Sequence, residues 1–224
     1  MNLITSESLR RPEVGCWHRR IKERYTPPHG IKLSVVLPCS AKKPYSKSKS
    51  HMMFRKYIRR GAGKKFALVH EVILTSPLGL VPRELESVYP AAHYDVPVTG
   101  YWSREEKEIA VELLAEYMKK ADAKVIGHVD GAYREICGEL NIPLTKERIL
   151  SGESLQELEQ KVSEALEEFA AKKRDKLESL RKVCDFQFGR GSGEYLIPRD
   201  AAVKKYQIFL DGEQVAAINP DSGF

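Results

Sequence analysis

Short apolar runs and longer amphipathic stretches alternate through the first two thirds of the chain. The apolar runs have the length and the β-branched content of buried strands, and they cover residues 33–37, 66–74 and 124–129. The amphipathic stretches repeat apolar side chains at three- and four-residue steps, which predicts helices at residues 52–60, 103–121 and 133–140. Because strands and helices alternate, we predict an α/β fold with a largely parallel sheet and helices on both faces.

Two local signals refine this pattern. Ser103 and Glu106 have the spacing of a capping box, which predicts that a helix begins there. Residues 75–86 are punctuated by proline and glycine and are predicted to form a long loop, of the kind that often carries function. Residues 1–30 are predicted to form an arm and a turn, with a short helix and an edge strand as open alternatives.

The pattern changes after residue 150. Ser154 and Glu157 have the spacing of a second capping box, and the apolar periodicity predicts a long helix from there to about residue 180. Further on, Asp211-Gly212 lies between two short β-prone runs, which predicts a hairpin. We therefore predict two domains, an α/β domain at residues 1–150 and a small α+β domain at residues 151–224.

Charge indicates the kind of partner. The 224 residues have a formal net charge of +6 and a sequence pI near 9.0, which favours an anionic partner. The excess is concentrated between Lys42 and Lys65, where ten basic residues occur without an acidic one. Such a patch is suited to phosphates. A well-solvated surface is the alternative interpretation.

The cysteines and the apolar runs indicate the compartment. The four cysteines are widely spaced, without a Cys-x-x-Cys pair or a signal peptide, so neither a disulfide framework nor a zinc site is expected. No apolar run approaches the roughly 20 residues of a membrane-spanning helix. We expect a cytoplasmic protein without a metal or another cofactor.

The segment that follows the first predicted strand is the strongest candidate for a site. The strand stops at Pro38, which cannot donate to a sheet ladder, and Cys39 therefore lies at the edge of the sheet. A polar loop leads from Cys39 to His51, where a helix is expected. Open α/β sheets bind ligands at this edge, outside the carboxyl ends of their strands.

Cys39 is the candidate nucleophile. A thiol reacts as the thiolate, and its pKa falls near cationic side chains and at helix amino ends. Lys42, Lys43 and the helix that begins near Ser50 predict such surroundings for Cys39. The alternative is an inert cysteine buried at a strand end.

Other residues of the segment each have a functional and a structural interpretation. Lys43 either orients a substrate carboxylate or phosphate or is solvated. Tyr45 either stacks on a base or packs behind the loop, and Ser48 is either a ligand or a helix cap. His51 acts as an acid or base near neutrality, or it makes a structural hydrogen bond.

Two aspartates outside the segment are further candidates. Asp95 lies in a second long loop and is able to polarise a substrate. Asp130 follows the third predicted strand, at the same edge of the sheet as Cys39, where it either contacts a base or caps the following helix.

The sequence motif of this segment resembles a known family signature. Pro38-Cys39, three residues, Lys43-Pro44-Tyr45, two residues, Ser48, two residues and His51 resemble the signature of archaeosine synthase, a tRNA-modifying enzyme of archaea. The similarity extends to residues 76–86, 94–100 and 185–189. It implies a uracil-DNA-glycosylase-like three-layer α/β/α fold, followed by a small module of the kind that precedes an RNA-binding PUA domain. It also implies a short or split form that lacks the transglycosylase-like and PUA domains.

The resemblance implies a reaction on tRNA. The family acts on 7-cyano-7-deazaguanine in the tRNA D-loop, and we expect the nitrile to receive the amine of free lysine and become an amidine, which a radical-SAM partner then cleaves. In this scheme Cys39, His51 and Lys43 are catalytic. The expected substrate-binding residues are Pro38, Pro44, Tyr45, Ser48, Asp95 and Asp130. A separate transglycosylase-like subunit is a further expected partner.

Two other function classes stay open. The chain is either a non-catalytic tRNA-binding or assembly subunit, as the basic segment suggests, or a base-exchanging transglycosylase or glycosylase-like enzyme, as the implied fold suggests. Binding of tRNA without binding of lysine favours the first, and release of a free base from tRNA favours the second.

Overall fold

The computed structural model describes residues 8–93 and 101–170, together with the short stretches 182–183, 186, 189, 206–210 and 213–218. The chain divides into two compact units, Met1–Lys173 and Arg174–Phe224. The sequence placed the boundary at residue 150 instead. The difference arises because helix α6 (Gly152–Leu166) packs against helix α3 (Lys49–Ala62) and so belongs to the first unit.

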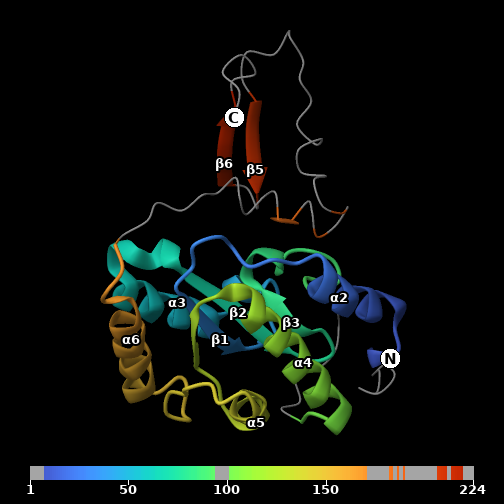
Figure 1. The fold of residues 1–224 in the computed structure, drawn as a ribbon, viewed down its shortest axis with the longest axis horizontal. Helices are drawn as coiled ribbons and strands as arrows, with labels where there is room; N and C mark the ends of the chain where they lie inside the picture. Colours follow the sequence, from blue (N-terminus) through green and yellow to red (C-terminus); the bar gives the residue numbers. More distant parts are fainter. Residues whose placement is uncertain are drawn as a thin grey trace. The chain divides into compact units, whose positions relative to one another are not determined.

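The first unit is built on a four-stranded sheet with the order β3-β2-β1-β4 (Figure 1). Its central strand β1 (Leu33–Pro38) is buried along its whole length. It pairs in parallel with β2 (Val69–Thr75) on one side and with β4 (Lys124–Gly127) on the other. Strand β3 (Gly79–Pro82) pairs with β2 in the antiparallel sense. The sheet is therefore mostly parallel.

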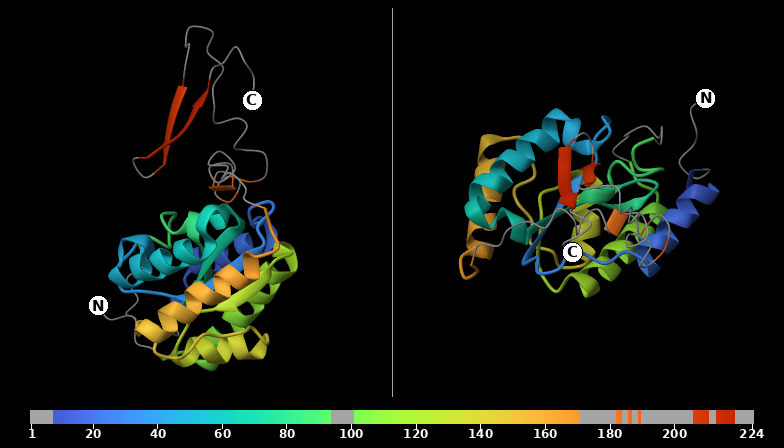
Figure 2. Two further views of the ribbon diagram at one scale, coloured as in Figure 1. Left: turned by 90° about the vertical axis from the view of Figure 1, so that its left-hand side faces the viewer. Right: turned by 90° about the horizontal axis from the view of Figure 1, so that it is seen from above.

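Helices cover both faces of the sheet (Figures 1 and 2). On one face, Leu33, Val35 and Leu37 of β1 share a core cluster with the buried side chains of α3 and α6. On the other face, α2 (Pro12–Glu23) packs against α4 (Arg104–Ala121), and Ser34 of β1 lies 2.7 Å from the Tyr117 hydroxyl of α4. Helix α5 (Gly131–Glu139) follows β4 and contacts α4. The predicted α/β fold is confirmed.

Strand β3 lies where the sequence predicted a loop, so that prediction was wrong. Gly79 begins the strand with a φ of 70°, and a β-carbon there would lie 2.6 Å from Leu113 Cδ1 of α4. Glycine therefore allows both the backbone turn and the close approach of α4. A strand of four residues is too short to show a clear alternation of apolar and polar side chains. Only its pairing with β2 defines it.

Two further element boundaries differ from the prediction. A 3₁₀ helix, η2 (Gly63–Leu68), occupies the beginning of the second predicted strand, which starts only at Val69. The amino-terminal region, whose structure the sequence left open, contains α2.

The two predicted capping boxes had different outcomes. Ser103 and Glu106 form the expected box at the start of α4, which confirms that prediction. The second box was wrong: Ser151 is the cap of α6 and accepts from the Ser154 amide at 3.2 Å. The Glu157 carboxylate accepts from the Lys146 amide instead, at 2.7 Å. Helix α6 begins earlier than predicted and ends at Leu166 rather than near residue 180.

The second unit contains the predicted hairpin. Strands β5 (Tyr206–Leu210) and β6 (Glu213–Ile218) pair in the antiparallel sense. The predicted turn residues Asp211-Gly212 and most of the short strand expected at residues 184–189 lie outside the described residues. In the part of the chain that the structure describes, no helix is both long and apolar enough to cross a membrane.

Candidate functional site

The end of β1 places Cys39 at the point where the connections of the sheet diverge. From β1 the chain runs through α3 to β2 on one side, whereas β4 lies on the other side of β1. A crevice forms at such a switch point, outside the carboxyl ends of the strands, and ligands of open α/β sheets bind there. Cys39, at the end of β1, and Asp130, at the end of β4, flank this position.

The Cys39 thiol is half-buried beside two hydroxyl groups. Its Sγ lies 3.0 Å from the Tyr133 Oη of α5, and either atom is able to donate. Burial raises the pKa of the thiol, and the opposing effects of the Tyr133 and Thr75 hydroxyls and of the Lys43 ammonium do not offset it. The expected lowering of this pKa was therefore wrong for the free protein. Cys39 is a protonated thiol at neutral pH.

Lys43 is close enough to Cys39 for the two groups to affect each other's titration. Burial lowers the pKa of the half-buried Lys43 ammonium. Its Nζ lies 5.9 Å from the centre of the Tyr45 ring, within the range of a cation–π contact. Pro44 follows through a cis peptide bond. The structure thus brings together Cys39 and Lys43, as the sequence predicted.

His51 is completely buried and both of its ring nitrogens are engaged. Its Nε2 donates to the Pro38 carbonyl at 2.9 Å, because that oxygen only accepts, and its Nδ1 accepts from the Arg83 guanidinium at 2.9 Å. Burial and the charge of Arg83 lower the pKa of His51 to about 3. The imidazole is therefore neutral and makes structural hydrogen bonds, the second of its two interpretations.

Arg83 links His51 to two buried carboxylates. In this His51–Arg83 network (His51, Glu71, Arg83 and Glu86), Arg83 contacts Glu71 at 2.6 Å and Glu86 at 2.8 Å. Glu86 also accepts from the Ser46 amide at 2.9 Å. The network therefore supports the site loop (residues 39–48) at two points, at Pro38 directly before it and at Ser46 within it.

Charge is retained inside this network because every member is paired. Burial raises the pKa of Glu71, but the Arg83 and Arg55 guanidinium groups outweigh it and the net pKa is lowered. Burial likewise lowers the pKa of Arg83, and Glu71 and Glu86 outweigh it in the opposite direction. The sequence did not indicate this network, since Arg83 is 32 residues from His51 along the chain.

Tyr45 and Ser48 have structural roles: of the two interpretations given for each, Tyr45 packs behind the loop and Ser48 caps a helix. Tyr45 lies in the 3₁₀ helix η1 (Tyr45–Lys47), is fully buried and donates its hydroxyl to Thr75 Oγ1 at 3.3 Å. Ser48 caps α3 by accepting from the His51 amide at 3.2 Å. Both side chains therefore support the shape of the site loop.

Asp130 occupies the cap position of α5, but its side chain makes no capping hydrogen bond. Burial raises the pKa of this half-buried carboxyl group. The interpretation of Asp130 as a helix cap is therefore wrong, and the alternative, contact with a base, stays a prediction. Asp95 lies outside the described residues, so its role stays a prediction as well.

The structure adds Thr75 and Tyr133 to the predicted residues. Thr75 ends β2, and Tyr133 lies in the first turn of α5 after β4. Both residues could have been predicted from the sequence, because polar residues near the carboxyl ends of neighbouring parallel strands lie at the same end of the sheet. The rim of the site (Cys39, Lys43, Asp130 and Tyr133) is assembled from the site loop, which follows β1, and from the start of α5, which follows β4.

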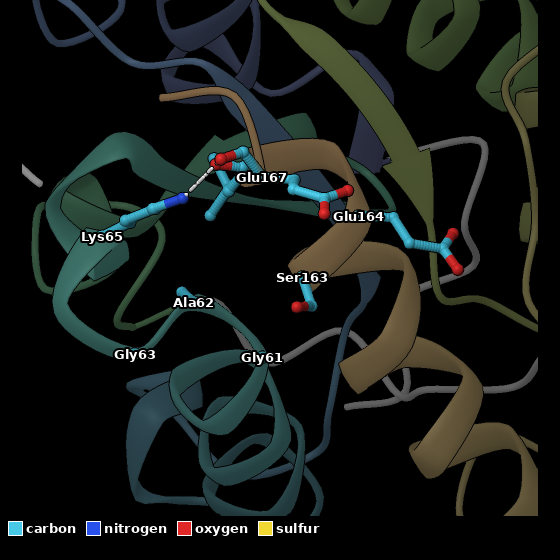
Figure 3. Close-up of a pocket in the computed structure, with 8 residues that line it drawn as sticks. Gly61, Ala62, Gly63, Lys65, Ser163, Glu164 and Glu167 are labelled. Carbon is cyan, nitrogen blue, oxygen red and sulfur yellow. Dashed lines mark hydrogen bonds between the residues drawn. The ribbon is translucent and has the colours of Figure 1, made fainter. Parts of the chain in front are cut away.

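A separate pocket lies between the carboxyl ends of α3 and α6 (Figure 3). Its lining includes Lys65, whose ammonium donates to the Leu166 and Glu167 carbonyls at 2.7 and 2.8 Å. Since α3 leads from the end of β1 to the start of β2, this pocket lies toward the edge of the sheet opposite Cys39. The Lys65 ammonium already binds the last carbonyl groups of α6, so the polar groups of this pocket have a structural role in joining the two helices.

No cluster of three or more histidine, cysteine, aspartate or glutamate side chains with metal-binding geometry occurs among the residues described.

The fold and the site define an α/β protein with a protonated cysteine at the switch point of a mostly parallel sheet. The chain belongs to a family described as "Domain of unknown function (DUF5591)", which matches residues 14–168.

Relatives confirm the resemblance to archaeosine synthase. The chain is 42% identical to archaeosine synthase subunit alpha of Thermococcus kodakarensis over 227 residues, which cover 94% of this chain and 39% of that protein. It is 43% identical to archaeosine synthase subunit alpha of Methanosarcina acetivorans over 240 residues, 98% of this chain and 37% of that one. The chain thus spans about two fifths of the length of these relatives.

One solved structure has the same fold. The crystal structure of AF0587, a protein of unknown function, matches with a TM-score of 0.60 and 24% sequence identity. The match covers 93% of this chain and 69% of that chain. At this level of identity it supports the arrangement of the elements and nothing about activity.

Proposed function

We propose that this chain takes part in archaeosine formation and adds the amine of free lysine to the nitrile of 7-cyano-7-deazaguanine in tRNA. The similarity to archaeosine synthase subunit alpha over nearly the whole chain supports the pathway. The observation that carries the chemistry is the half-buried Cys39 thiol, 3.0 Å from the Tyr133 hydroxyl at the switch point of the sheet.

The first step is addition of the thiol across the nitrile. The Cys39 sulfur forms a bond to the nitrile carbon, and the thiol proton goes to the nitrile nitrogen, which gives a covalent thioimidate. Because the thiolate is the nucleophile, the thiol gives up its proton as the sulfur attacks, and that proton is the one that the nitrogen requires. The Tyr133 hydroxyl is placed to pass that proton on.

The second step is displacement by lysine. The amine nitrogen forms a bond to the thioimidate carbon, the carbon–sulfur bond breaks, and a proton from the amine returns to the sulfur. The products are an amidine and the free thiol. The Lys43 ammonium orients the carboxylate of the incoming lysine by charge. Both ring nitrogens of His51 are engaged by Pro38 and Arg83, so His51 acts as a positioning residue through Pro38.

Asp130 recognises the base in this proposal. A carboxylate accepts two hydrogen bonds side by side, which matches the N1–H and the 2-amino group of a deazaguanine. The side chain is available for this role because it does not cap α5. Of the other substrate-binding candidates, Pro38 and Pro44 shape the pocket, and Asp95 is assigned to it by the resemblance alone.

Further partners belong to the proposal. The name "subunit alpha" of the relatives supports a partner subunit. We infer that this partner carries the radical-SAM centre that cleaves the amidine, and that a transglycosylase-like subunit completes the recognition of tRNA.

Replacement of Cys39 tests the covalent step. The full chain is incubated with labelled lysine and either nitrile-bearing tRNA or the corresponding free nucleoside at high concentration, and the adduct is measured by mass spectrometry. Cys39→Ala is expected to lower adduct formation at least ~1000-fold, the scale of a lost nucleophile. Cys16→Ser, a change of the half-buried cysteine in α2, is the matched control and is expected to keep full activity.

Omission of lysine provides the second readout. The wild-type chain is then expected to trap the nucleoside on the Cys39 peptide, with a mass increase equal to the whole nucleoside, since addition has no leaving group. Near-normal adduct formation by Cys39→Ala would eliminate covalent catalysis in favour of direct attack by lysine. Binding of tRNA without any adduct would instead favour the non-catalytic subunit, and release of a free base would favour the glycosylase-like enzyme.

A further inference from the structure

The outer face of α3 presents lysine and arginine side chains to solvent without an acidic neighbour in its own sequence. No aspartate or glutamate occurs between Glu23 and Glu71. We define the α3 basic face by its exposed cations, Lys47, Lys49, Lys56, Arg59, Arg60 and Lys64. Two methionines lie on the same face, Met52 with 54% and Met53 with 40% of its surface exposed.

Most of this charge has no ion-pair partner among the residues that the structure describes. Arg60 pairs with Glu159 of α6 at 3.3 Å, and Arg59 lies over the Phe66 ring. In the described part of the chain, Lys47, Lys49 and Lys56 enter no ion pair. Exposed charges that are not neutralised internally attract a partner of opposite charge.

The position of this face relates it to the site. Ser48 ends the site loop and caps α3, so the helix begins where the loop ends. From there α3 runs beside α6 toward the amino ends of the parallel strands (Figure 2). At a rise of about 1.5 Å per residue, Lys49 and Lys56 are roughly 10 Å apart along the helix. A chain of phosphates bound along α3 therefore leads to the entrance of the Cys39 site.

We infer that the α3 basic face binds the sugar–phosphate backbone of tRNA, with Met52 and Met53 packing on a sugar or a base, and delivers the target nucleotide to Cys39. The inference rests on the proposed function. Lysine is depleted at protein–protein interfaces, whereas it is a general contact of nucleic-acid phosphates. A face dominated by lysine therefore favours RNA over an acidic protein.

Charge reversal tests the inference in the full chain. Lys49→Glu with Lys56→Glu is expected to weaken binding of unmodified tRNA about 10-fold or more and to lower the slope of log affinity against log salt by about two, one for each lost phosphate contact. Lys119→Glu with Lys146→Glu changes the net charge equally at exposed lysines outside α3, and it is expected to change the affinity by less than about two-fold.

The methionines provide an independent readout. Met52→Ala with Met53→Ala is expected to weaken tRNA binding about three-fold with an unchanged salt slope, because an apolar contact releases no counterions. Adduct formation on the free nucleoside is expected to be unchanged in both α3 variants, since a nucleoside has no phosphate to bind.

Three results would overturn the inference. These are equal losses in the α3 and control variants, unchanged tRNA affinity in the α3 variant, and loss of binding to an acidic partner protein with tRNA affinity intact. Failure of the proposed function is a different result: the wild-type chain then forms no adduct with the nucleoside, while tRNA binding still depends on α3.

Discussion

The buried ion pairs behind the site loop, on its inner side, and the ionisable groups at its rim, on its outer side, have pKa values that shift in opposite senses. On the inner side, Glu71 and Arg83 are buried, yet their partners shift each pKa toward the charged form. On the outer side, burial outweighs the effects of neighbouring groups and shifts the pKa values of Cys39, Lys43 and Asp130 toward their neutral forms. The ion pairs on the inner side therefore favour their charged forms, whereas the groups on the outer side favour their neutral forms.

This difference divides the signature into two functional classes. Tyr45, Ser48 and His51 face inward and hold the loop through Thr75, α3 and Arg83. Cys39 and Lys43 face the rim. Groups with perturbed pKa values are typical of functional sites, and buried ion-pair networks also occur as purely structural features. Substitutions on the inner side should therefore affect folding, and those on the outer side should affect turnover.

The largest effect on stability is expected at Arg83. Arg83→Ala leaves Glu71 and Glu86 buried without their main partner, and we expect the free energy of unfolding to fall by about 3–5 kcal/mol. Urea denaturation measures it. Arg55→Ala is the control, because Arg55 is more exposed and Arg83 retains Glu71 in its absence. A similar loss in both variants would contradict the central place of Arg83 in the network.

The outer side is tested by Asp130. Asp130→Asn keeps the shape of the side chain but can accept from only one of the two donors of the base, so kcat/KM for the nitrile nucleoside should fall about 10- to 100-fold, the scale of a hydrogen bond to a charged group. Unfolding should change little. Steady-state kinetics with the nucleoside and with an analogue that lacks the 2-amino group measure the effect.

The analogue makes this prediction specific. Removal of the 2-amino group should lower kcat/KM strongly for the wild-type chain. It should lower kcat/KM little for Asp130→Asn, because the side chain that binds this group is already altered. The control is Asp122→Asn, at an exposed position with a φ of 44° that asparagine tolerates. Equal sensitivity of the wild type and Asp130→Asn to the analogue would remove Asp130 from base recognition.

The smallest effect is a pH dependence of stability. His51 has a pKa of about 3 in the folded chain, well below its usual value of 6.5, so the unfolded chain binds the additional proton as the pH falls. Between about pH 6 and pH 4 this histidine should lower the free energy of unfolding by about 1 kcal/mol per pH unit. The contribution is fully present above the unfolded pKa and is lost toward the folded pKa.

Substitution of His51 isolates this contribution. His51→Gln keeps one donor and one acceptor but does not titrate, and the slope of stability against pH should decrease by that amount in urea denaturation at several pH values. His93→Gln, the same change at an exposed histidine, is the matched control. An unchanged slope in His51→Gln would show that His51 does not titrate as described.

Local signals predicted the framework of this protein. The strand before Pro38, the capping box at Ser103 and the alternation of strands and helices each depend on neighbouring residues, and each was correct. The short strand β3 was missed because its pairing with β2 defines it. The start of α6 was misplaced because Ser151 and Ser154, three residues apart, are both of the residue type that caps helices, and only the structure shows that Ser151 is the cap.

The sequence by itself determined the α/β architecture, the family and the position of Cys39 at the carboxyl end of a strand. The reason is that the periodicity of apolar residues and the sequence motif are local properties of the chain. Only the tertiary structure decided that His51 is a neutral structural residue and that the Cys39 thiol is protonated. The physical reason is that a pKa depends on burial and on distant partners: Arg83 reaches His51 and Tyr133 reaches Cys39 only after the sheet has formed.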